Sequence, residues 1–91
     1  MDSTERKLTE RDLAVLAFEG SWWQASAPKD QAVRERFQLT EAEYVVVLDE
    51  LIASEAALDV DPLLVRRLRR QRDRRRQAHL DRRTADQEVV R

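Results

Sequence analysis

Residues 28–52, with the sequence PKDQAVRERFQLTEAEYVVVLDELI, read as two helices joined by a three-residue turn. In the first helix, Ala32, Val33 and Phe37 recur at the spacing that places side chains on one face of a helix. An apolar face of this kind must pack against other parts of the chain. We therefore expect this pair of helices to be the unit around which the rest of the chain is arranged.

The second helix of the pair begins at a clear start signal. Thr40 is followed three residues later by Glu43, so each side chain can accept a backbone N–H at the helix start, which is a capping box. One apolar face then continues through Tyr44, Leu48, Leu51 and Ile52. Two helices joined in this way over residues 28–53 have the layout of a helix-turn-helix.

Composition restricts the fold class. One Gly and two Pro in 91 residues leave no room for the repeated tight turns of a β fold, so we predict an all-α protein. No cysteine is present, which excludes disulfides and thiolate zinc sites and favours a cytoplasmic, reducing compartment. No apolar run approaches the roughly 18 residues of a membrane span, and residues 1–7 lack the apolar stretch of a signal peptide.

The expected architecture is a small helix-turn-helix-like bundle of three to four helices with a long Arg-rich C-terminal helix. Capping patterns start the first helix at Thr9 and the last at Asp61 and Pro62. Four regions follow along the chain: a flexible N-terminus over 1–7, the bundle over 8–65, an Arg-rich helical extension over 66–83 and a disordered tail over 84–91.

The buried faces of the first and last helices are predicted from apolar spacing. The first is expected to bury Leu13, Leu16, Ala17, Gly20 and Trp23, and the last to dock through Leu63, Leu64, Val65 and Leu68. Adjacent helical residues diverge by roughly 100°, so Trp22 and Trp23 cannot both face the core. The second indole either packs under the later chain or is exposed as an anchor for a partner.

Charge divides the chain into an acidic head and a basic tail. Residues 1–65 hold 6 Lys and Arg against 14 Asp and Glu, a net charge of −8. Residues 66–91 hold 11 Arg against 4 Asp and Glu, a net charge of +7. This asymmetry favours either an anionic partner for the tail or attraction between the tail and the head.

The arginine run RRLRRQRDRRR at 66–76 is the strongest chemical signal. Guanidinium groups bind phosphates bidentately and stay charged at any working pH, so the run predicts contact with a DNA backbone. The alternative is a solubilising tail whose charge complements the helix dipole. The predicted nucleic-acid-binding residues are Arg66, Arg67, Arg69, Arg70, Arg72, Arg74, Arg75 and Arg76.

A second candidate surface, a groove or partner face, comprises Thr40, Glu41, Glu43, Val46 and Trp22. It contains no Arg or Lys, and its two glutamates would be repelled by a polyanion. Three arrangements remain open. The tail anchors DNA while the helix pair positions it, the acidic helix binds a basic protein surface, or tail and head cover one another until a partner intervenes.

Little in the sequence points to catalysis. The single His79 stands in the basic tail, where a solvated role is expected, and one Gly leaves neither a Walker loop nor a dinucleotide fingerprint. The neighbouring carboxylates are expected to be helix-start and surface charges. We therefore expect no enzyme, no catalytic, cofactor-binding or metal site, no cofactor, no small-molecule substrate and no membrane partner.

The blocks LTERDLAVLAFEGSWWQ, AVRERFQLTEAEYVVVLDELI and DPLLVRRLRR resemble a group of small actinobacterial proteins classed as domain-of-unknown-function family 3263. The resemblance covers roughly residues 8–76 and implies a helix-turn-helix, DNA-binding protein. Gln38 stands where relatives tend to have glycine, and Glu43 and Val45 replace what are more often a basic and an aromatic residue.

The leading hypothesis is a small cytoplasmic, DNA-associated protein that regulates transcription and would be located on the nucleoid. The alternative is a protein-interaction adaptor that contacts the transcription machinery or another regulator through the acidic helix-turn-helix face. The sequence leaves the oligomeric state open, with a homodimer as one alternative.

Overall fold

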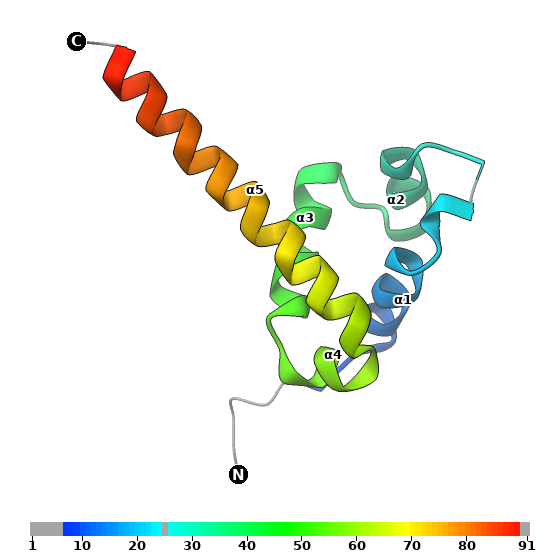
Figure 1. Cartoon of the computed structure of the whole chain (residues 1–91). Coiled ribbons are helices and arrows are strands. Elements are labelled where there is room, and N and C mark those ends of the chain that lie inside the picture. The colour runs from blue at the N-terminus through cyan, green and yellow to red at the C-terminus, as the bar shows by residue number, and fades with distance from the viewer. Residues whose placement is uncertain (1–6, 25, 90–91) are drawn as a thin grey trace.

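The computed structural model describes residues 7–24 and 26–89, and the regular secondary structure of these residues is helical throughout. The elements are α1 (Glu10–Glu19), the 3-10 helix η1 (Trp22–Gln24), α2 (Lys29–Phe37), α3 (Glu41–Ile52), α4 (Glu55–Val60) and α5 (Pro62–Val89). The first four α-helices form a bundle, and α5 crosses it and then projects away from it (Figure 1). The predicted all-α fold with a long C-terminal helix is confirmed.

Helices α1 and α3 begin where the sequence predicts capping boxes. Thr9 Oγ1 accepts from the backbone N of Asp12 at 3.0 Å, and Asp12 Oδ2 accepts from the N of Thr9 at 2.9 Å. The same reciprocal pair joins Thr40 and Glu43 at 3.1 and 2.9 Å. Each box satisfies two backbone N–H groups that would otherwise have no partner at the helix start.

Residues 38–40 form the turn between α2 and α3, and Gln38 there has left-handed backbone angles, with φ 56° and ψ 38°. A left-handed residue with a side chain carries a steric cost that glycine avoids. Two hydrogen bonds compensate, since Gln38 N donates to Arg34 O and Gln38 Nε2 donates to Glu35 O, each at 2.9 Å. Glutamine therefore terminates α2 in the conformation that a glycine would adopt.

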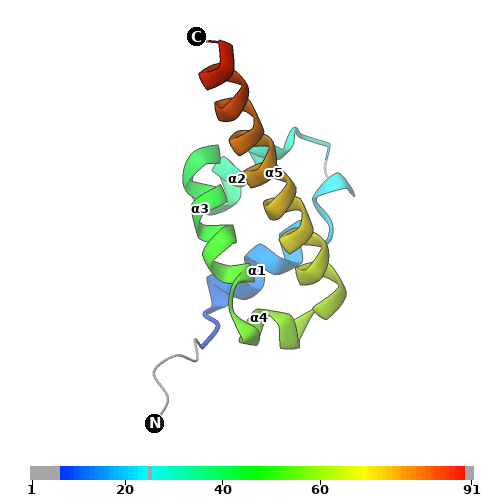
Figure 2. The same cartoon turned by 60° about the vertical axis from the view of Figure 1, so that its left-hand side comes forward.

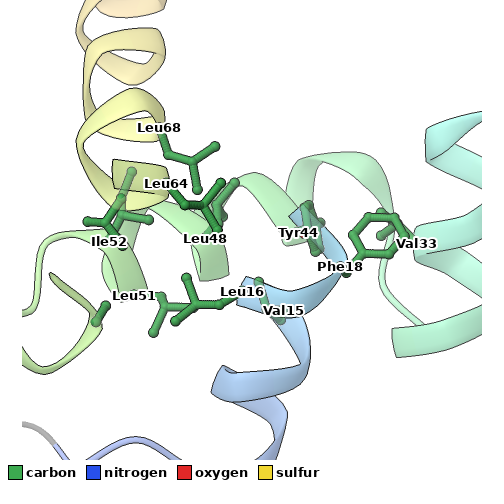
Figure 3. Packing of buried hydrophobic residues seen from close by; sticks show 12 residues of the cluster. Val15, Leu16, Phe18, Val33, Tyr44, Leu48, Leu51, Ile52, Leu64 and Leu68 are labelled. Atoms are coloured by element: carbon green, nitrogen blue, oxygen red, sulfur yellow. The ribbon is translucent and has the colours of Figure 1, made fainter. Parts of the chain in front are cut away.

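The core lies where α1, α3 and α5 meet and extends to α2 and α4 (Figure 3). Aromatic rings join the first three α-helices, since Phe18 lies 5.7 Å from Phe37 and 6.0 Å from Tyr44 in edge-to-face pairs. The buried apolar residues are Val15, Leu16, Phe18, Val33, Tyr44, Leu48, Leu51, Ile52, Ala57, Leu64, Val65 and Leu68.

The predicted buried face of α1 is only partly confirmed, since Leu16 is buried but most of the other predicted residues are not. Leu13, Ala17 and Gly20 are exposed, whereas Asp12 and Glu19 are buried. Both carboxylates accept hydrogen bonds, Asp12 from Thr9 and Glu19 from other helices, which removes the penalty for their burial. Apolar spacing did not predict this face fully, because acidic residues such as Asp12 and Glu19 are expected at the surface.

Two further predictions about apolar residues are corrected. Leu63 is 78% exposed, because α5 turns it away from the bundle while the next two residues are buried. Helix α1 ends at Glu19 and not at the tryptophans, which belong to η1. Trp22 is the half-buried indole that packs on the core, and Trp23 is 54% exposed.

Helix α4 is the short connection between α3 and α5 at one end of the bundle (Figure 2). Asp61 Oδ1 accepts from the N of Leu64 at 3.3 Å, which confirms the predicted start of α5 at Pro62. The helix runs to Val89, six residues beyond the expected end of the extension at 83. Of the tail predicted over 84–91, the last two residues lie outside the described part of the chain.

Over residues 7–24 and 26–89, no helix has both the length and the apolar character that crossing a bilayer requires.

Candidate nucleic-acid interface

The inner side of α5 changes character along its length. Leu64, Val65 and Leu68 are buried against the bundle. At 3.6 residues per turn, the next inward positions are Arg72 and Arg75. The helix therefore passes from apolar packing to polar contact as it leaves the core.

The opposite side of α5 carries Arg66, Arg70 and Arg74, which we call the outer stripe. Their four-residue spacing places them on one face over about 12 Å of helix, because an α-helix rises about 1.5 Å per residue. All three side chains are exposed. Within the described part of the chain, no hydrogen bond or ion pair joins any of them to another residue. The outer stripe thus presents three full positive charges to solvent.

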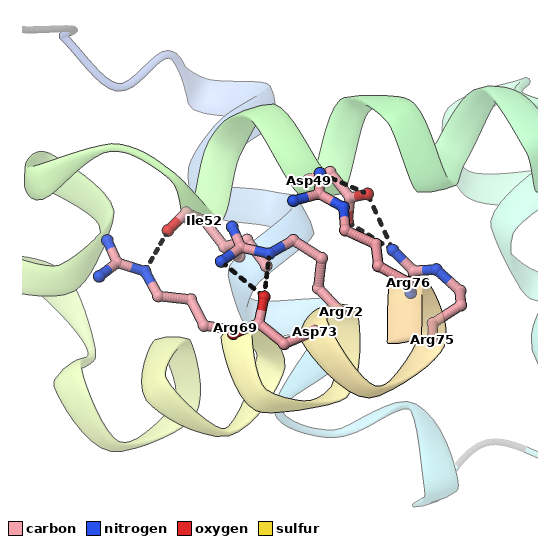
Figure 4. Close-up of polar contacts among 7 residues, drawn as sticks. All are labelled: Asp49, Ile52, Arg69, Arg72, Asp73, Arg75 and Arg76. Atoms are coloured by element: carbon pink, nitrogen blue, oxygen red, sulfur yellow. Dashed lines mark hydrogen bonds and ion pairs between the residues drawn. The ribbon is translucent and has the colours of Figure 1, made fainter. Parts of the chain in front are cut away.

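Arg69 has a structural role. Its Nε donates to the carbonyl O of Ile52 at 2.6 Å, and its Nη2 lies 3.4 Å from the carbonyl O of Ser54 (Figure 4). These carbonyls lie at the end of α3 and just after it, where the helix itself supplies no donor. Arg69 therefore joins α5 to the C-terminus of α3, and its guanidinium group is already engaged.

Asp49 on α3 engages two more of the predicted arginines. Arg75 Nη2 donates to both carboxylate oxygens of Asp49, at 2.9 and 2.8 Å, and Arg76 Nη2 lies 3.8 Å from Oδ2 (Figure 4). Arg72 pairs instead with its neighbour Asp73 at 3.1 Å. The predicted attraction between tail and head is therefore present as a specific ion pair between α5 and α3.

Arg67 lies beside the exposed indole. Its guanidinium carbon is 5.9 Å from the ring centroid of Trp23, within the range of a cation–π contact. The ring of Trp22 meets Trp23 edge-on at 6.5 Å. Trp23, a residue of η1, therefore lies against the outer side of α5, next to the outer stripe.

The candidate face on α3 is exposed and acidic. Thr40, Glu41 and Glu43 are exposed at the helix start, where Glu43 is used in the capping box, and Val46 is 57% exposed. Glu50 lies one turn after Val46 and is also exposed. This face gathers apolar and negatively charged groups and offers no cation to a phosphate.

Trp22 does not belong to that face. It is half-buried against the core, and Lys29 Nζ lies 5.0 Å from its ring centroid. Lys29 also bridges to Glu19 on α1, with its Nζ 3.1 Å from each carboxylate oxygen. The structure therefore places the predicted partner residue Trp22 in a packing role and exposes its neighbour Trp23.

Sequence reasoning missed a buried polar cluster that joins α1, α2 and α3. Glu19 is 2% exposed and accepts from Lys29 and, at 2.6 Å, from the hydroxyl of Tyr44. Burial raises the pKa of the Tyr44 hydroxyl well above its usual range, and the hydrogen bond to Glu19 and its negative charge raise it further. No local pattern signals this cluster, because Glu19 and Tyr44 are 25 residues apart in the sequence.

The same cluster lines a small cavity of about 140 Å³. Glu19, Lys29 and Tyr44 form part of its wall, and Asp49 and Arg75 line it from α3 and α5. All buried polar side-chain atoms of the described residues have a hydrogen-bond partner. The cluster therefore joins α1, α2 and α3 through hydrogen bonds and an ion pair inside the bundle.

Comparison with known proteins gives one match. The model of a family described as "Protein of unknown function (DUF3263)" matches residues 7–80, which include the bundle and most of α5. No curated protein and no solved structure matches the chain.

Proposed function

We infer that this protein, which belongs to the DUF3263 family, is a small DNA-associated protein that binds the phosphate backbone through the outer stripe of α5. The observation that carries the proposal is that Arg66, Arg70 and Arg74 are exposed, share one face and have no polar partner among the described residues. Guanidinium groups form charge-assisted, bidentate hydrogen bonds with phosphates. Regulation of transcription on the nucleoid is the corresponding proposed role.

Some arginines of α5 already donate hydrogen bonds within the protein, and others are available to a phosphate. Arg69 and Arg75 are excluded from the primary contact, because a phosphate would have to displace the acceptors they already bind. Three phosphate contacts supply affinity and orientation without reading bases. We therefore expect binding that depends strongly on salt and weakly on DNA sequence.

Helix α3 has a supporting part in this proposal. The three-residue turn with a left-handed Gln38 agrees with a helix-turn-helix arrangement of α2 and α3. However, Glu43 and Glu50 are exposed on α3, and among the described residues no ion pair offsets the repulsion that their charges would meet in a DNA groove. We therefore propose that α3 positions α5 and does not enter the groove.

The test compares two triple variants in binding to a random-sequence DNA duplex across a salt series. R66Q/R70Q/R74Q removes the outer stripe, and R11Q/R34Q/R36Q removes the same charge from exposed positions on α1 and α2. Loss of three phosphate contacts reduces the slope of log affinity against log salt by about 2.7. We expect that reduction in the first variant and little change in the second.

Two results would contradict the proposal. One is binding of the wild-type protein that does not vary with salt. The other is an equal loss of affinity in the two triple variants, because net charge and not the outer stripe would then explain it.

A second candidate function rests on the exposed face of α3. Val46 is 57% exposed, with Glu43 and Glu50 one turn away on either side, which fits a basic, apolar segment of a protein partner. As an adaptor of this kind, the protein would bind an amphipathic Lys/Leu peptide, and E50K would weaken that binding while strengthening any binding to DNA. Equal affinity of the wild-type protein and E50K for the peptide would exclude the adaptor function.

A further inference from the structure

A groove runs beside the outer stripe, between η1 and the start of α5. It has a volume of about 390 Å³, and its wall includes Trp23, Leu63, Arg67 and Arg70 together with the acidic residue Asp61. Trp23 and Leu63 are two of the most exposed large apolar side chains in the described residues. Arg70 belongs both to this groove and to the outer stripe, so the two surfaces are continuous.

The exposed indole is held in place by its neighbours. Arg67 contacts the Trp23 ring at 5.9 Å, and the edge-on contact with Trp22 ties the ring to the half-buried indole of the core. Even so, about half of the surface of Trp23 is accessible at 54%. A flat aromatic surface that is oriented and exposed next to guanidinium groups is the combination on which nucleic-acid bases stack.

The surroundings of Trp23 favour an unpaired base over a duplex. In a duplex, the faces of the bases are covered by their neighbours in the stack, so an indole cannot reach them unless the stack opens. In a single strand, the bases turn outward from a backbone that a basic surface can follow. Arg70 and Trp23 line the same groove, so the groove offers a guanidinium group for a phosphate and an indole for a base.

We propose that Trp23, with Arg67 and Arg70 beside it, forms a base-stacking subsite and that the preferred ligand of the outer stripe is single-stranded DNA. This inference rests on the proposed binding of phosphates and adds the class of nucleic acid. The stripe supplies charge to any DNA, and the indole adds affinity only where a base is free.

The test uses two single strands of equal length, an oligothymidylate and an abasic oligonucleotide with the same number of phosphates. Stacking of one base on an aromatic side chain contributes about 5- to 150-fold in affinity. We therefore expect the wild-type protein to bind the oligothymidylate at least about fivefold more tightly than the abasic strand. In W23A we expect this difference to disappear. Without the indole, the bases of the oligothymidylate have no stacking partner, and the abasic strand has no bases to lose.

Two control variants isolate the indole. L63A removes an exposed apolar side chain of the same groove and leaves the preference for the oligothymidylate intact. W23F keeps an aromatic face and retains part of the preference, which separates stacking from any effect of W23A on folding. Circular dichroism of each variant shows whether the helices are kept.

Three results would overturn the inference. They are equal affinity of the wild-type protein for the two strands, an equal loss on both strands in W23A, and competition by polyglutamate as strong as that by the oligothymidylate. The last result would assign the groove to an acidic protein segment. Salt-dependent binding of both strands without a base effect leaves the proposed function standing, and so does binding of duplex DNA alone. Failure to bind either the single strands or a duplex contradicts the proposed function itself.

Discussion

The inner and outer sides of α5 use the same residue type in two different ways. On the inner side, Arg69 donates to carbonyl groups at the C-terminal end of α3, and Arg75 donates to Asp49. On the outer side, Arg66, Arg70 and Arg74 face solvent without a polar partner among the described residues. A guanidinium group is available to an external anion only where the bundle provides no acceptor, and this depends on its position around the helix.

The apolar residues of α5 provide the largest expected contrast between the two sides. Leu68→Ala creates a cavity in the core and should lower the free energy of unfolding by about 2–5 kcal/mol. Leu63→Ala should change it by less than about 0.5 kcal/mol, because Leu63 is mostly exposed. Urea unfolding followed by circular dichroism measures both values. Similar costs at the two positions would contradict the orientation of α5 described here.

Within the bundle, the buried cluster should respond to the loss of one hydroxyl. Tyr44→Phe removes a donor from the buried carboxylate of Glu19 and should lower the free energy of unfolding by about 1.5–3 kcal/mol. Unfolding at neutral pH measures this value. A change below about 0.5 kcal/mol would show that the hydroxyl does not support the carboxylate.

The same substitution should alter the dependence of stability on pH. The pKa of the Tyr44 hydroxyl is raised in the folded state, so the folded protein holds this proton more tightly than the unfolded chain does. Its contribution is therefore complete below the ordinary tyrosine pKa of about 10 and is lost as the pH rises above that value. The wild-type protein should lose more stability than Tyr44→Phe above this pH, and parallel curves would contradict the raised pKa.

A comparison of adjacent arginines tests the two sides directly. Arg69→Gln leaves the carbonyl of Ile52 without its donor and should cost about 1–2 kcal/mol of unfolding free energy. Arg70→Gln should cost less than about 0.5 kcal/mol and should weaken DNA binding more than Arg69→Gln does. Chemical unfolding ranks the two variants by loss of stability, and DNA titration ranks them by loss of affinity. If the same variant were the more affected in both measurements, the two sides would not differ in function.

A modest effect on stability is expected at the ion pair between α3 and α5. Asp49→Asn releases Arg75 and Arg76 and should cost less than about 1 kcal/mol, because the two arginine side chains are 48% and 61% exposed. The freed groups should steepen the slope of log DNA affinity against log salt by up to about 2. Asp59→Asn removes the same charge from an exposed site on α4 and serves as the control. Equal changes in the two variants would exclude a specific role for Asp49.

Much of the fold could be predicted from neighbouring residues. The boxes at Thr9 and Thr40 and the start of α5 at Pro62 each depend on contacts within four residues, so their patterns are visible in the sequence. The face of α3 that contains Tyr44, Leu48, Leu51 and Ile52 was also predicted, because it is uninterrupted by buried acids. The buried face of α1 was predicted only in part, because Asp12 and Glu19 are buried there and accept hydrogen bonds.

The candidate site could be predicted only as a region. The arginine run predicts positive charge on α5. The acceptors that decide which arginines are engaged and which are free lie far away in the sequence. Arg69 and Ile52 are 17 residues apart, and Arg75 and Asp49 are 26 apart. The choice between Trp22 and Trp23 as the exposed indole likewise depended on α1 ending at Glu19, before either of them.

The sequence by itself determined the helical class, the helix starts and the separation of acidic from basic regions, because these follow from composition and from interactions within a few residues. Only the tertiary structure decided which guanidinium groups face solvent and which indole is exposed. Those outcomes depend on how helices α1 to α5 pack, which sets the direction of each side chain relative to acceptors far away in the sequence.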